Sequence, residues 1–512
     1  MDIEKIKRQG LEVDFQKYIA MGSTNFLGLR VRNAFPIHTA ITTADYVRLK
    51  WLGIFHNKVR PGRFMLRLRV VNGMLTADQL ELVAELAKKF GSGRIDITTR
   101  QGIQIRDFDF YYLPRILQDL EAAGLSTLQT GMDNFRNVTG CALAGIDPEE
   151  VMNASSVVRE LTLRFQGNLD YVNLPRKLNV SITGCRADCA DSAASDIGLT
   201  PASRDGETGF NVKIGGALGS PPPRLATPLD VFIREEDASE LCLRIAEIYR
   251  DHGSRDKRAR TRLKFLLDDW GIERFRSTLE ERMGRTLERA GEEPETASHP
   301  GNFLGIHPQK QEGMHYAGLL VPVGRLSASQ AMELARLSRE YGAEELRLTP
   351  NQNVIIPHIP EESLEPFKRE PLLRELSPHP SRVMANLVAC TGNDYCDFAV
   401  IESKSRALEI ARFLEERFPG LELKIHVSGC RNSCGKHGIA DLGLQGARIR
   451  IDGRLHEAVE VFLGIGSGKV AEKMGKVPWK DLSRRLEDLI GRYVKEGMEG
   501  EALGEFYKRL QG

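Results

Sequence analysis

Four cysteines near the C-terminal end of the chain have the type and spacing of a metal-cluster site. Cys390 and Cys396 enclose five residues, and Cys430 and Cys434 enclose three. Four thiolates from two loops can enclose a cubane of iron and sulfide. Structural zinc takes closer cysteine pairs, with two to four residues between them on both sides. The spacing therefore favours an iron–sulfur cluster, with a zinc site or a set of buried free thiols as alternatives.

The segment that carries the second cysteine pair occurs twice in the chain. "NVSITGCRADCADS" covers residues 179–192, and "KIHVSGCRNSCGKH" covers residues 424–437. Each segment runs from an apolar strand into Gly-Cys-Arg and reaches a second Cys after two further residues. Such a long internal similarity indicates that the chain arose by duplication.

The two copies do not offer the same number of thiols. The first copy has Cys185 and Cys189, with Cys141 upstream, but Asp147 stands where the counterpart of Cys396 would fall. Three thiolates do not complete a four-cysteine cluster site. We therefore expect the cluster in the second copy and interpret the first as a remnant of duplication whose turn serves another purpose. A second, labile metal site is the alternative.

Several basic residues of the first half lie in strand-like or loop segments. Arg67 and Arg69 have a period of two in "FMLRLRVV", which places them on one face of a strand. Guanidinium groups bind carboxylates and small oxyanions through paired hydrogen bonds. Each of these residues taken alone is more typical of a solvated or structural charge, but the set predicts an anion-binding cleft. The other members are Arg100, Arg136, Arg176 and Lys177.

A second, longer repeat sets the positions of these residues. "GMLTADQLELVAELAKKFGSGRIDITTRQGIQI" begins at Gly73, and "GRLSASQAMELARLSREYGAEELRLTPNQNVII" begins at Gly324. Both copies have the Ser/Thr-x-x-Gln pattern of a capping box, followed by apolar residues at helical spacing. The capping pairs are Thr76 with Gln79, and Ser327 with Gln330.

Strand candidates flank both helices. They are "FMLRLRVV", "RIDIT" and "IQIRDF" in the first copy, and "YAGLLVPV", "ELRLT" and "VIIPHI" in the second. This β-α-β-β order predicts an α+β protein (mixed α/β) in which two ferredoxin-like half-domains pair into one layered unit. Gly91 and Gly342 follow the helices and suit a left-handed turn.

Composition and charge exclude several classes of protein. The 512 residues are 41% hydrophobic and 28% charged, as in a globular protein of two or more domains. Lys plus Arg number 71 against 70 Asp plus Glu, which argues against a nucleic-acid-binding protein. No apolar run is long enough for a membrane span, and "MDIEKIKRQG" has no secretory signal. We therefore expect a cytoplasmic protein with reduced thiols.

The ordered motifs resemble the sirohaem-dependent nitrite and sulfite reductases. The cysteine pattern follows "TPNQNVII" and is preceded by "DNFRN" and "NLPRKLN", and the resemblance extends from about residue 46 to 493. "FLGIHPQKQEG", "VPVGRL" and "NLVACTG" are similar to ferredoxin-dependent nitrite reductases in particular. The resemblance implies a duplicated fold of two paired half-domains and two α/β domains that carry sirohaem and a [4Fe–4S] cluster. The boundaries expected are 1–61 (N-terminal arm), 62–130 (half-domain 1), 131–300 (sirohaem domain, first repeat), 301–313 (linker), 314–377 (half-domain 2) and 378–512 (sirohaem and cluster domain, second repeat).

The resemblance also implies roles for individual residues. The cluster ligands are expected to be Cys390, Cys396, Cys430 and Cys434, and Cys434 is also expected to bind the sirohaem iron. The carboxylates of sirohaem explain the basic set. The cofactor-contacting positions implied are Arg100, Gln101, Arg176, Lys264, Gln352 and Asn353. The positions implied to bind the oxyanion substrate are Arg67, Arg136, Lys177 and Asn179.

Two positions favour nitrite over sulfite as the substrate. Sulfite reductases usually have Lys-x-Lys where this chain has Lys177-Leu-Asn179, and several have tyrosine where this chain has Phe55. The loss of one lysine lowers the positive charge beside the anion, which suits singly charged nitrite. A ferredoxin-dependent sulfite reductase is the close alternative. Precorrin-3B synthase is more distant, because the complete oxyanion-binding set is present, and a non-catalytic iron–sulfur protein would not need the basic cleft.

The electron donor is expected to be a separate protein. No flavin or nicotinamide domain is visible, and "GIGSGKV" at residues 464–470 lacks the residues of a phosphate loop. The family's donor is a small acidic ferredoxin. "HGSRDKRARTRLK", residues 252–264, is a candidate docking segment, with a solvated helix face as the alternative. We expect a monomer that binds neither nucleic acid nor membrane.

Overall fold

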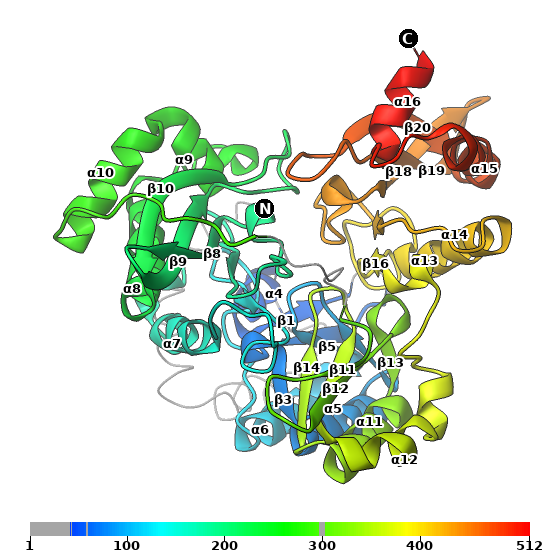
Figure 1. The fold of residues 1–512 in the computed structure, drawn as a ribbon, viewed down its shortest axis with the longest axis horizontal. Coiled ribbons are helices and arrows are strands. Elements are labelled where there is room, and N and C mark those ends of the chain that lie inside the picture. Colours follow the sequence, from blue (N-terminus) through cyan, green and yellow to red (C-terminus); the bar gives the residue numbers. More distant parts are fainter. Residues whose placement is uncertain (1–40, 42, 58–59, 296–302, 512) are drawn as a thin grey trace.

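The computed structural model describes residues 41, 43–57, 60–295 and 303–511. It contains four five-stranded sheets, two in the paired half-domains and one in each of two further domains. In Figure 1 the half-domains lie together at the bottom, and the two further domains form separate lobes above them. The predicted duplicated α+β architecture is therefore confirmed.

The first half-domain is a sheet covered by helices. Its strand order is β1-β2-β5-β4-β13, and four of the five strands come from the first half of the chain. The elements are α4 (Thr43–Arg48), β1 (Ile54–His56), β2 (Arg63–Leu68), β3 (Met74–Thr76), α5 (Ala77–Phe90), β4 (Arg94–Ile97), β5 (Ile103–Asp109) and α6 (Leu113–Ala122).

The second half-domain repeats this arrangement. Its strand order is β11-β12-β15-β14-β3. The elements are β11 (Gly305–Pro308), β12 (Met314–Leu319), β13 (Arg325–Ser327), α11 (Ala328–Tyr341), β14 (Glu345–Leu348), β15 (Val354–Pro360) and α12 (Leu364–Lys368).

The two half-domains exchange a strand. β13 pairs with β4 in the first sheet, with Leu326 opposite Ile95, and β3 pairs with β14 in the second, with Leu346 opposite Leu75. Helices α5 and α11 pack against each other, and the apolar side chains of both units form one continuous core. Neither sheet is complete without the other half, so the pairing fixes the relative position of the two repeats.

Both predicted capping boxes are present. The Thr76 side chain accepts from Gln79 N while the Gln79 side chain accepts from Thr76 N, and Ser327 and Gln330 do the same at α11. The prediction of a left-handed backbone at Gly91 and Gly342 is wrong, because their φ angles are −110° and −124°. A Cβ at Gly91 would lie 2.6 Å from Arg106 O. Close packing of the helix end on β5 explains the glycine there.

The first lobe is the domain after half-domain 1. Its sheet has the order β10-β9-β8-β7-β6, in which β6, β7 and β8 are parallel and the rest antiparallel. The elements are β6 (Thr139–Gly140), α7 (Ser155–Phe165), β7 (Val180–Ile182), β8 (Ile197–Arg204), β9 (Glu207–Ile214), β10 (Thr227–Arg234), α8 (Glu235–His252), α9 (Leu263–Trp270) and α10 (Ile272–Met283).

The second lobe has the same topology. Its sheet runs β16-β17-β18-β19-β20, again with three parallel strands followed by antiparallel ones. The elements are α13 (Arg382–Ala385), β16 (Leu387–Ala389), α14 (Ser403–Arg417), β17 (Ile425–Ser428), β18 (Leu442–Ile451), β19 (Arg454–Leu463), β20 (Glu472–Pro478), α15 (Trp479–Glu496) and α16 (Leu503–Gln511).

Two segments expected outside the half-domains contribute to them. β1, in the expected N-terminal arm, is an edge strand paired with β2, and β11, in the expected linker, is the matching edge strand paired with β12. The remainder of the arm before residue 41 lies outside the described residues. No helix among the described residues is long and apolar enough to cross a membrane.

Candidate functional site

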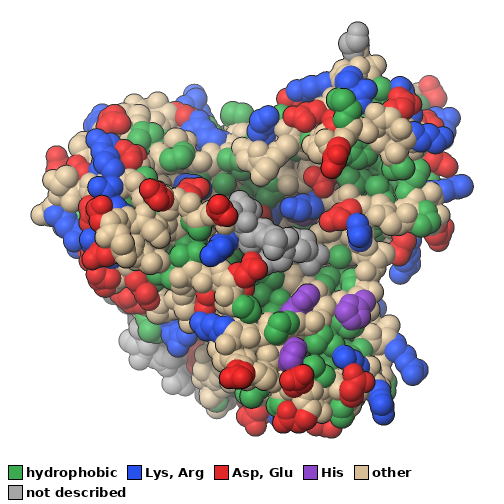
Figure 2. All heavy atoms as spheres, in the orientation of Figure 1, with side chains coloured by type: hydrophobic (Ala, Val, Ile, Leu, Met, Phe, Trp, Pro, Cys, Tyr) green, Lys and Arg blue, Asp and Glu red, His purple; other side chains and the backbone are tan. Residues whose placement is uncertain are grey.

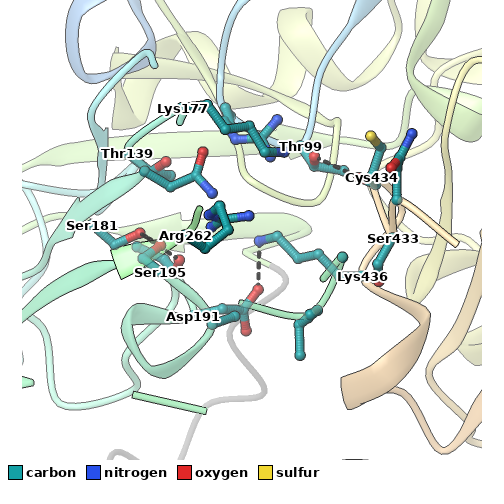
Figure 3. A pocket seen from close by; sticks show the side chains of 17 residues that line it. Thr99, Thr139, Lys177, Ser181, Asp191, Ser195, Arg262, Ser433, Cys434 and Lys436 are labelled. Atoms are coloured by element: carbon teal, nitrogen blue, oxygen red, sulfur yellow. Dashed lines mark hydrogen bonds and ion pairs between the residues drawn. The ribbon is translucent and has the colours of Figure 1, made fainter. Parts of the chain in front are cut away.

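A cleft lies where half-domain 1 and the two lobes meet. The space that it encloses, including the part open to solvent, is about 510 Å³. Figure 3 shows that its side chains come from all three bodies. The lining residues used below are Thr99, Arg100, Lys177, Asn179, Asp191, Arg262, Ser433, Cys434 and Lys436.

Of the predicted cations, Arg100 and Lys177 line this cleft, and Arg67 and Arg136 lie close enough to interact electrostatically with its Cys434. Arg67 lies on β2 with its guanidinium 4.6 Å from the ring centre of Phe55, and Arg100, Arg136 and Lys177 lie in loops around it. Burial and the neighbouring charges of Arg67 and Arg100 hold the pKa of Arg136 well below its usual range. Burial and the charges of Arg100 and Arg262 do the same for Lys177. The four cations therefore repel one another across a shared space, which favours a bound anion.

None of these four cations forms an ion pair with a carboxylate within the described part of the chain. Arg136 Nη1 and Asn179 Oδ1 are buried atoms without a hydrogen-bond partner among the residues that the structure describes. Buried charges are normally paired, because desolvation is costly. Cations without a carboxylate partner around one cleft fit the carboxylates of sirohaem and a small oxyanion.

Cys434 stands next to the cations. Cys434 is exposed and lines the cleft. Its backbone oxygen accepts a hydrogen bond from Thr99 Oγ1 at 2.9 Å, which joins the second repeat to the first (Figure 3). Burial among protein atoms alone would raise the pKa of the Cys434 thiol, but the charges of Lys177, Arg100 and Arg67 outweigh it and lower the pKa. Cys434 is thus prepared to act as a thiolate ligand.

The other three cysteines lie in the loops beside Cys434. Cys390 follows β16, and Cys430 and Cys434 follow β17, so the ends of two adjacent parallel strands bring the pairs together. Burial raises the pKa of Cys390 and Cys396, and raises that of Cys430 to about 12. Gly429 N donates to Cys390 Sγ at 3.0 Å. Backbone donors to sulfur are typical of iron–sulfur sites.

Gln101 and Gln352, which we predicted to contact the cofactor, form hydrogen bonds to backbone groups around the site. Gln101 Nε2 donates to Leu348 O and its Oε1 accepts from Gly140 N, while Gln352 Nε2 donates to Ile97 O and its Oε1 accepts from Ala389 N. These four bonds of 2.9–3.0 Å are related by the duplication. Both side chains are buried and engaged with backbone. They tie the paired half-domains to the strands that precede Cys141 and Cys390.

Three further candidates also contact protein groups. Asn353 is buried, and its Oδ1 accepts from Val321 N at 3.0 Å. Arg176 Nη1 lies 3.1 Å from Asp133 Oδ1 in an ion pair. Lys264 is buried on α9, and its Nζ donates to the backbone oxygens of Ser220 and Pro222. Direct cofactor contact by these side chains stays a prediction.

Two cations of the cleft, Arg262 and Lys436, were not among the predicted site residues. Arg262 forms an ion pair with Asp196 through two hydrogen bonds, from Nε to Oδ1 at 3.0 Å and from Nη2 to Oδ2 at 2.7 Å. The side chains of Arg262 and Asp196 are 5% and 0% exposed. Asp196 also accepts from Asn179 N at 2.8 Å, so the pair positions Asn179. Arg262 lies in the basic segment 252–264, for which we considered a docking surface and a solvated helix face. Its pattern of charges gave the signal, but the inward direction of Arg262 is visible only in the fold.

Family models match most of the two repeats. The model described as the nitrite/sulfite reductase ferredoxin-like half domain matches residues 57–123 and 307–373, and the model described as the nitrite and sulphite reductase 4Fe-4S domain matches residues 131–287. These ranges cover more than half of the chain. The chain belongs to the nitrite and sulfite reductase family.

Relatives in this family are similar over most of their length. A protein named ferredoxin–nitrite reductase from Synechococcus elongatus is 45% identical over 86% of this chain and 88% of its own. The assimilatory ferredoxin-dependent nitrite reductase of Haloferax mediterranei is 39% identical over 83% of this chain and 77% of its own. The solved NirA protein of Mycobacterium tuberculosis has a TM-score of 0.87 at 27% identity, covering 94% of each chain.

Membership in the nitrite and sulfite reductase family confirms three predictions: the duplicated fold, an oxidoreductase, and the cofactors sirohaem and [4Fe–4S]. The family model with the cluster in its description matches the first repeat, which holds Cys141, Cys185 and Cys189, and not the second. The assignment of the cluster to the four cysteines of the second repeat remains a prediction.

Proposed function

We propose that the protein reduces nitrite to ammonium in a six-electron reaction, with reduced ferredoxin as the electron donor. The observation that carries the proposal is the group of four cations around Cys434 that form no ion pair with any described carboxylate. The proteins named as ferredoxin-dependent nitrite reductases among the relatives support the choice of reaction.

Cys390, Cys396, Cys430 and Cys434 would hold the [4Fe–4S] cluster, and Cys434 would also be a ligand of the sirohaem iron. The joined centres supply the electrons for the reduction. The chain's own contribution is a thiolate that the cations stabilise. Arg100 supplies a positive charge for the sirohaem carboxylates, since it lines the same cleft as Cys434.

Arg67, Arg136 and Lys177 would hold the nitrite anion. Their charges offset the negative charge that develops on oxygen as the N–O bonds break. The lowered pKa of Lys177 makes its ammonium group a better proton donor near neutral pH than an exposed lysine. Asn179 orients the anion without adding charge, and the Asp196 carboxylate fixes its backbone.

Nitrite is favoured over sulfite by the charge of this set. Asn179 Oδ1 has no partner among the described atoms, whereas a lysine here would add a further cation beside Arg100 and Lys177. Burial lowers the pKa values of Arg136 and Lys177, and repulsion from the neighbouring cations lowers them further. A more highly charged anion such as sulfite would need the additional charge.

The donor and the setting follow from the same chemistry. A ferredoxin supplies single electrons, and the chain's cysteines must stay reduced, so we infer a cytoplasmic setting. On the face in Figure 2, acidic and basic side chains are intermingled. Segment 252–264 is a weak docking candidate, since Arg258 pairs with Asp133 and Arg262 with Asp196. The donor's docking site must therefore include other residues.

The test is an anaerobic assay of the purified holoenzyme with reduced ferredoxin. We expect nitrite to be consumed and ammonium formed in equal amounts, with a kcat/KM for nitrite at least about tenfold above that for sulfite. A visible spectrum with the sirohaem Soret and red bands should accompany the activity. A higher kcat/KM for sulfite, or a spectrum with a cluster alone, would contradict the proposal.

A further inference from the structure

Three cysteines of the first repeat come together outside the set of residues that line the cleft. Cys141 follows β6, and Cys185 and Cys189 follow β7, at the topological position that the four expected cluster ligands occupy in the second repeat. Their three sulfur atoms all lie within 4.8 Å of one another, and the Sγ atoms of Cys185 and Cys189 are 3.5 Å apart. No other group of three His, Cys, Asp or Glu side chains in the described chain is this compact.

The thiol group is deeply buried. Cys141 and Cys185 are 2% exposed and Cys189 is 9% exposed, and the surrounding side chains include Phe303, Tyr316 and Ile355. By contrast, Cys242 is buried alone in helix α8. A single buried cysteine behaves as a small apolar side chain. Three thiols from two loops that meet at one point need a further explanation.

The distances distinguish a single ion from a cubane. With Zn–S bonds of about 2.3 Å, tetrahedral sulfur ligands lie about 3.8 Å apart. In a cubane each thiolate binds a different iron and points outward, so its sulfurs lie further apart than those around one ion. The sulfurs of the first repeat are close enough for one ion. The cysteines of the second repeat do not form so compact a group, as a cubane requires.

The donors around the sulfurs fit a thiolate site. Leu143 N donates to Cys141 Sγ at 3.4 Å, and Thr183 Oγ1 lies 2.9 Å from Cys185 Sγ. Metal-binding thiolates are commonly stabilised by such outer donors. No described carboxylate or imidazole joins the group, so the ligand set is three soft sulfurs, which selects Zn²⁺ or Cu(I) over harder ions. A Zn²⁺ ion here would take its fourth ligand from outside this group.

The loop that carries Cys141 is fixed from the other half of the chain. Arg347 Nη1, on β14, donates to Ala142 O at 3.1 Å and to Ala144 O at 2.8 Å. Gln311 Nε2 donates to Gly145 O at 2.8 Å. The thiols therefore lie at the contact between the first lobe and half-domain 2. An ion there would crosslink the loops that follow β6 and β7, at the place where the first lobe contacts half-domain 2.

We propose that Cys141, Cys185 and Cys189 bind one thiophilic metal ion, Zn²⁺ or Cu(I), separate from the iron–sulfur cluster. The ion stabilises the junction of the first lobe with half-domain 2 and takes no part in electron transfer. The three thiols of the incomplete copy are thus a mononuclear site with a structural task. This inference is independent of the choice of substrate.

The first experiment uses the wild-type holoenzyme, purified anaerobically from cells grown with added Zn²⁺ and, separately, reloaded with Cu(I). Elemental analysis after dialysis against EDTA should find one zinc or copper ion per chain in addition to iron. X-ray absorption at the metal edge should show a sulfur shell at about 2.3 Å for zinc. Absence of both metals, or a disulfide between Cys185 and Cys189 in the purified protein, would overturn the proposal.

The second experiment compares Cys185→Ser and Cys141→Ser with the control Cys242→Ser. The first two should lose the non-iron metal and lower the apparent unfolding temperature by about 4 °C or more, with iron content and sirohaem absorption unchanged. Cys242→Ser should keep the metal. Loss of iron from Cys185→Ser would instead locate the cluster in the first repeat. Nitrite reduction by the same preparations tests the proposed function separately. If the variants do not fold, the metal content and X-ray absorption spectrum of the wild-type protein still test the metal site.

Discussion

Lys436 Nζ lies 2.6 Å from Asp191 Oδ2, although the two residues occupy the same position in the two repeats. Each stands two residues after the second cysteine of its turn, and each has a left-handed backbone, with φ of 58° and 50°. An identical pair of residues would repel here. Opposite charges at one duplicated position instead join the two lobes beside the cleft, as Figure 3 shows.

This ion pair should couple the two lobes measurably. Burial raises the pKa of Asp191, but the charge and hydrogen bond of Lys436 outweigh burial and lower it. In a double-mutant cycle of Asp191→Asn and Lys436→Met, we expect a coupling free energy of about 1 kcal/mol in urea unfolding at pH 7. The coupling should vanish as pH falls through the lowered pKa of Asp191. A pH-independent coupling would contradict the assignment.

Arg67 and Arg69 should have different roles despite their period-two spacing. Arg69 is 3% exposed, and its guanidinium donates to the backbone oxygens of Arg136, Leu128, Gln129 and Phe135. We expect Arg69→Gln to lower the free energy of unfolding by about 2–3 kcal/mol.

Arg67→Gln should leave the free energy of unfolding nearly unchanged and lower kcat/KM for nitrite by about 100-fold, because a cation facing the substrate is lost. Steady-state kinetics and urea unfolding on both variants check the contrast. Equal losses of stability in the two variants would count against a substrate role for Arg67.

Asn179→Lys should shift the substrate preference toward sulfite. The new ammonium group would add a positive charge to the oxyanion-binding set, which favours the more highly charged anion. We expect the ratio of kcat/KM for sulfite to that for nitrite to rise by about tenfold, equivalent to about 1.4 kcal/mol. Asn179→Gln keeps the amide and adds no charge, so its ratio should stay near wild type. An unchanged ratio in Asn179→Lys would remove the charge argument.

Substitutions in the two cysteine groups should have different effects on the metal content of the protein. Cys434→Ser should abolish nitrite reduction and remove the electronic coupling between sirohaem and cluster, seen by electron paramagnetic resonance. Cys430→Ser should lose the cluster iron, because a four-thiolate site cannot close with three. The matched substitution in the first repeat, Cys185→Ser, should retain both iron and activity. Coupled centres in Cys434→Ser would refute the shared ligand.

Two buried histidines should make the second lobe sensitive to acid. Burial lowers the pKa of His426 and of His437 to about 4. Because unfolded histidine titrates near 6.5, the unfolded state binds more protons between about pH 6.5 and 4. The free energy of unfolding should therefore fall across this range, by about 3 kcal/mol at most for each histidine.

The measurement is the denaturation midpoint of the holoenzyme against pH. His426→Gln should flatten the decline, since it removes one titrating group. His379→Gln, which removes an exposed imidazole, should leave the decline unchanged. A slope that is the same in wild type and His426→Gln would exclude His426 as a cause.

Local patterns predicted much of the fold because their causes are local. The capping boxes at Thr76 and Ser327 and the helices that follow depend on side chains three or four residues apart. The strand exchange pairs β13 with β4 and β3 with β14, which are about 250 positions apart in the chain. A local pattern of apolar residues cannot predict such a pairing. The edge strands β1 and β11 were missed for the same reason, since they are defined by their partners.

Residue types and their spacing were enough to recognise the duplication, the family, and the side chains gathered at the site: four cysteines, a set of cations and one asparagine. Three further facts came only from the folded chain: which cations lie at the cleft, that Arg69 and Lys264 bind backbone oxygens, and that three thiols of the first repeat lie together. The reason is physical. Residue type and spacing fix local conformation, whereas the direction of a side chain depends on packing between segments distant in the chain.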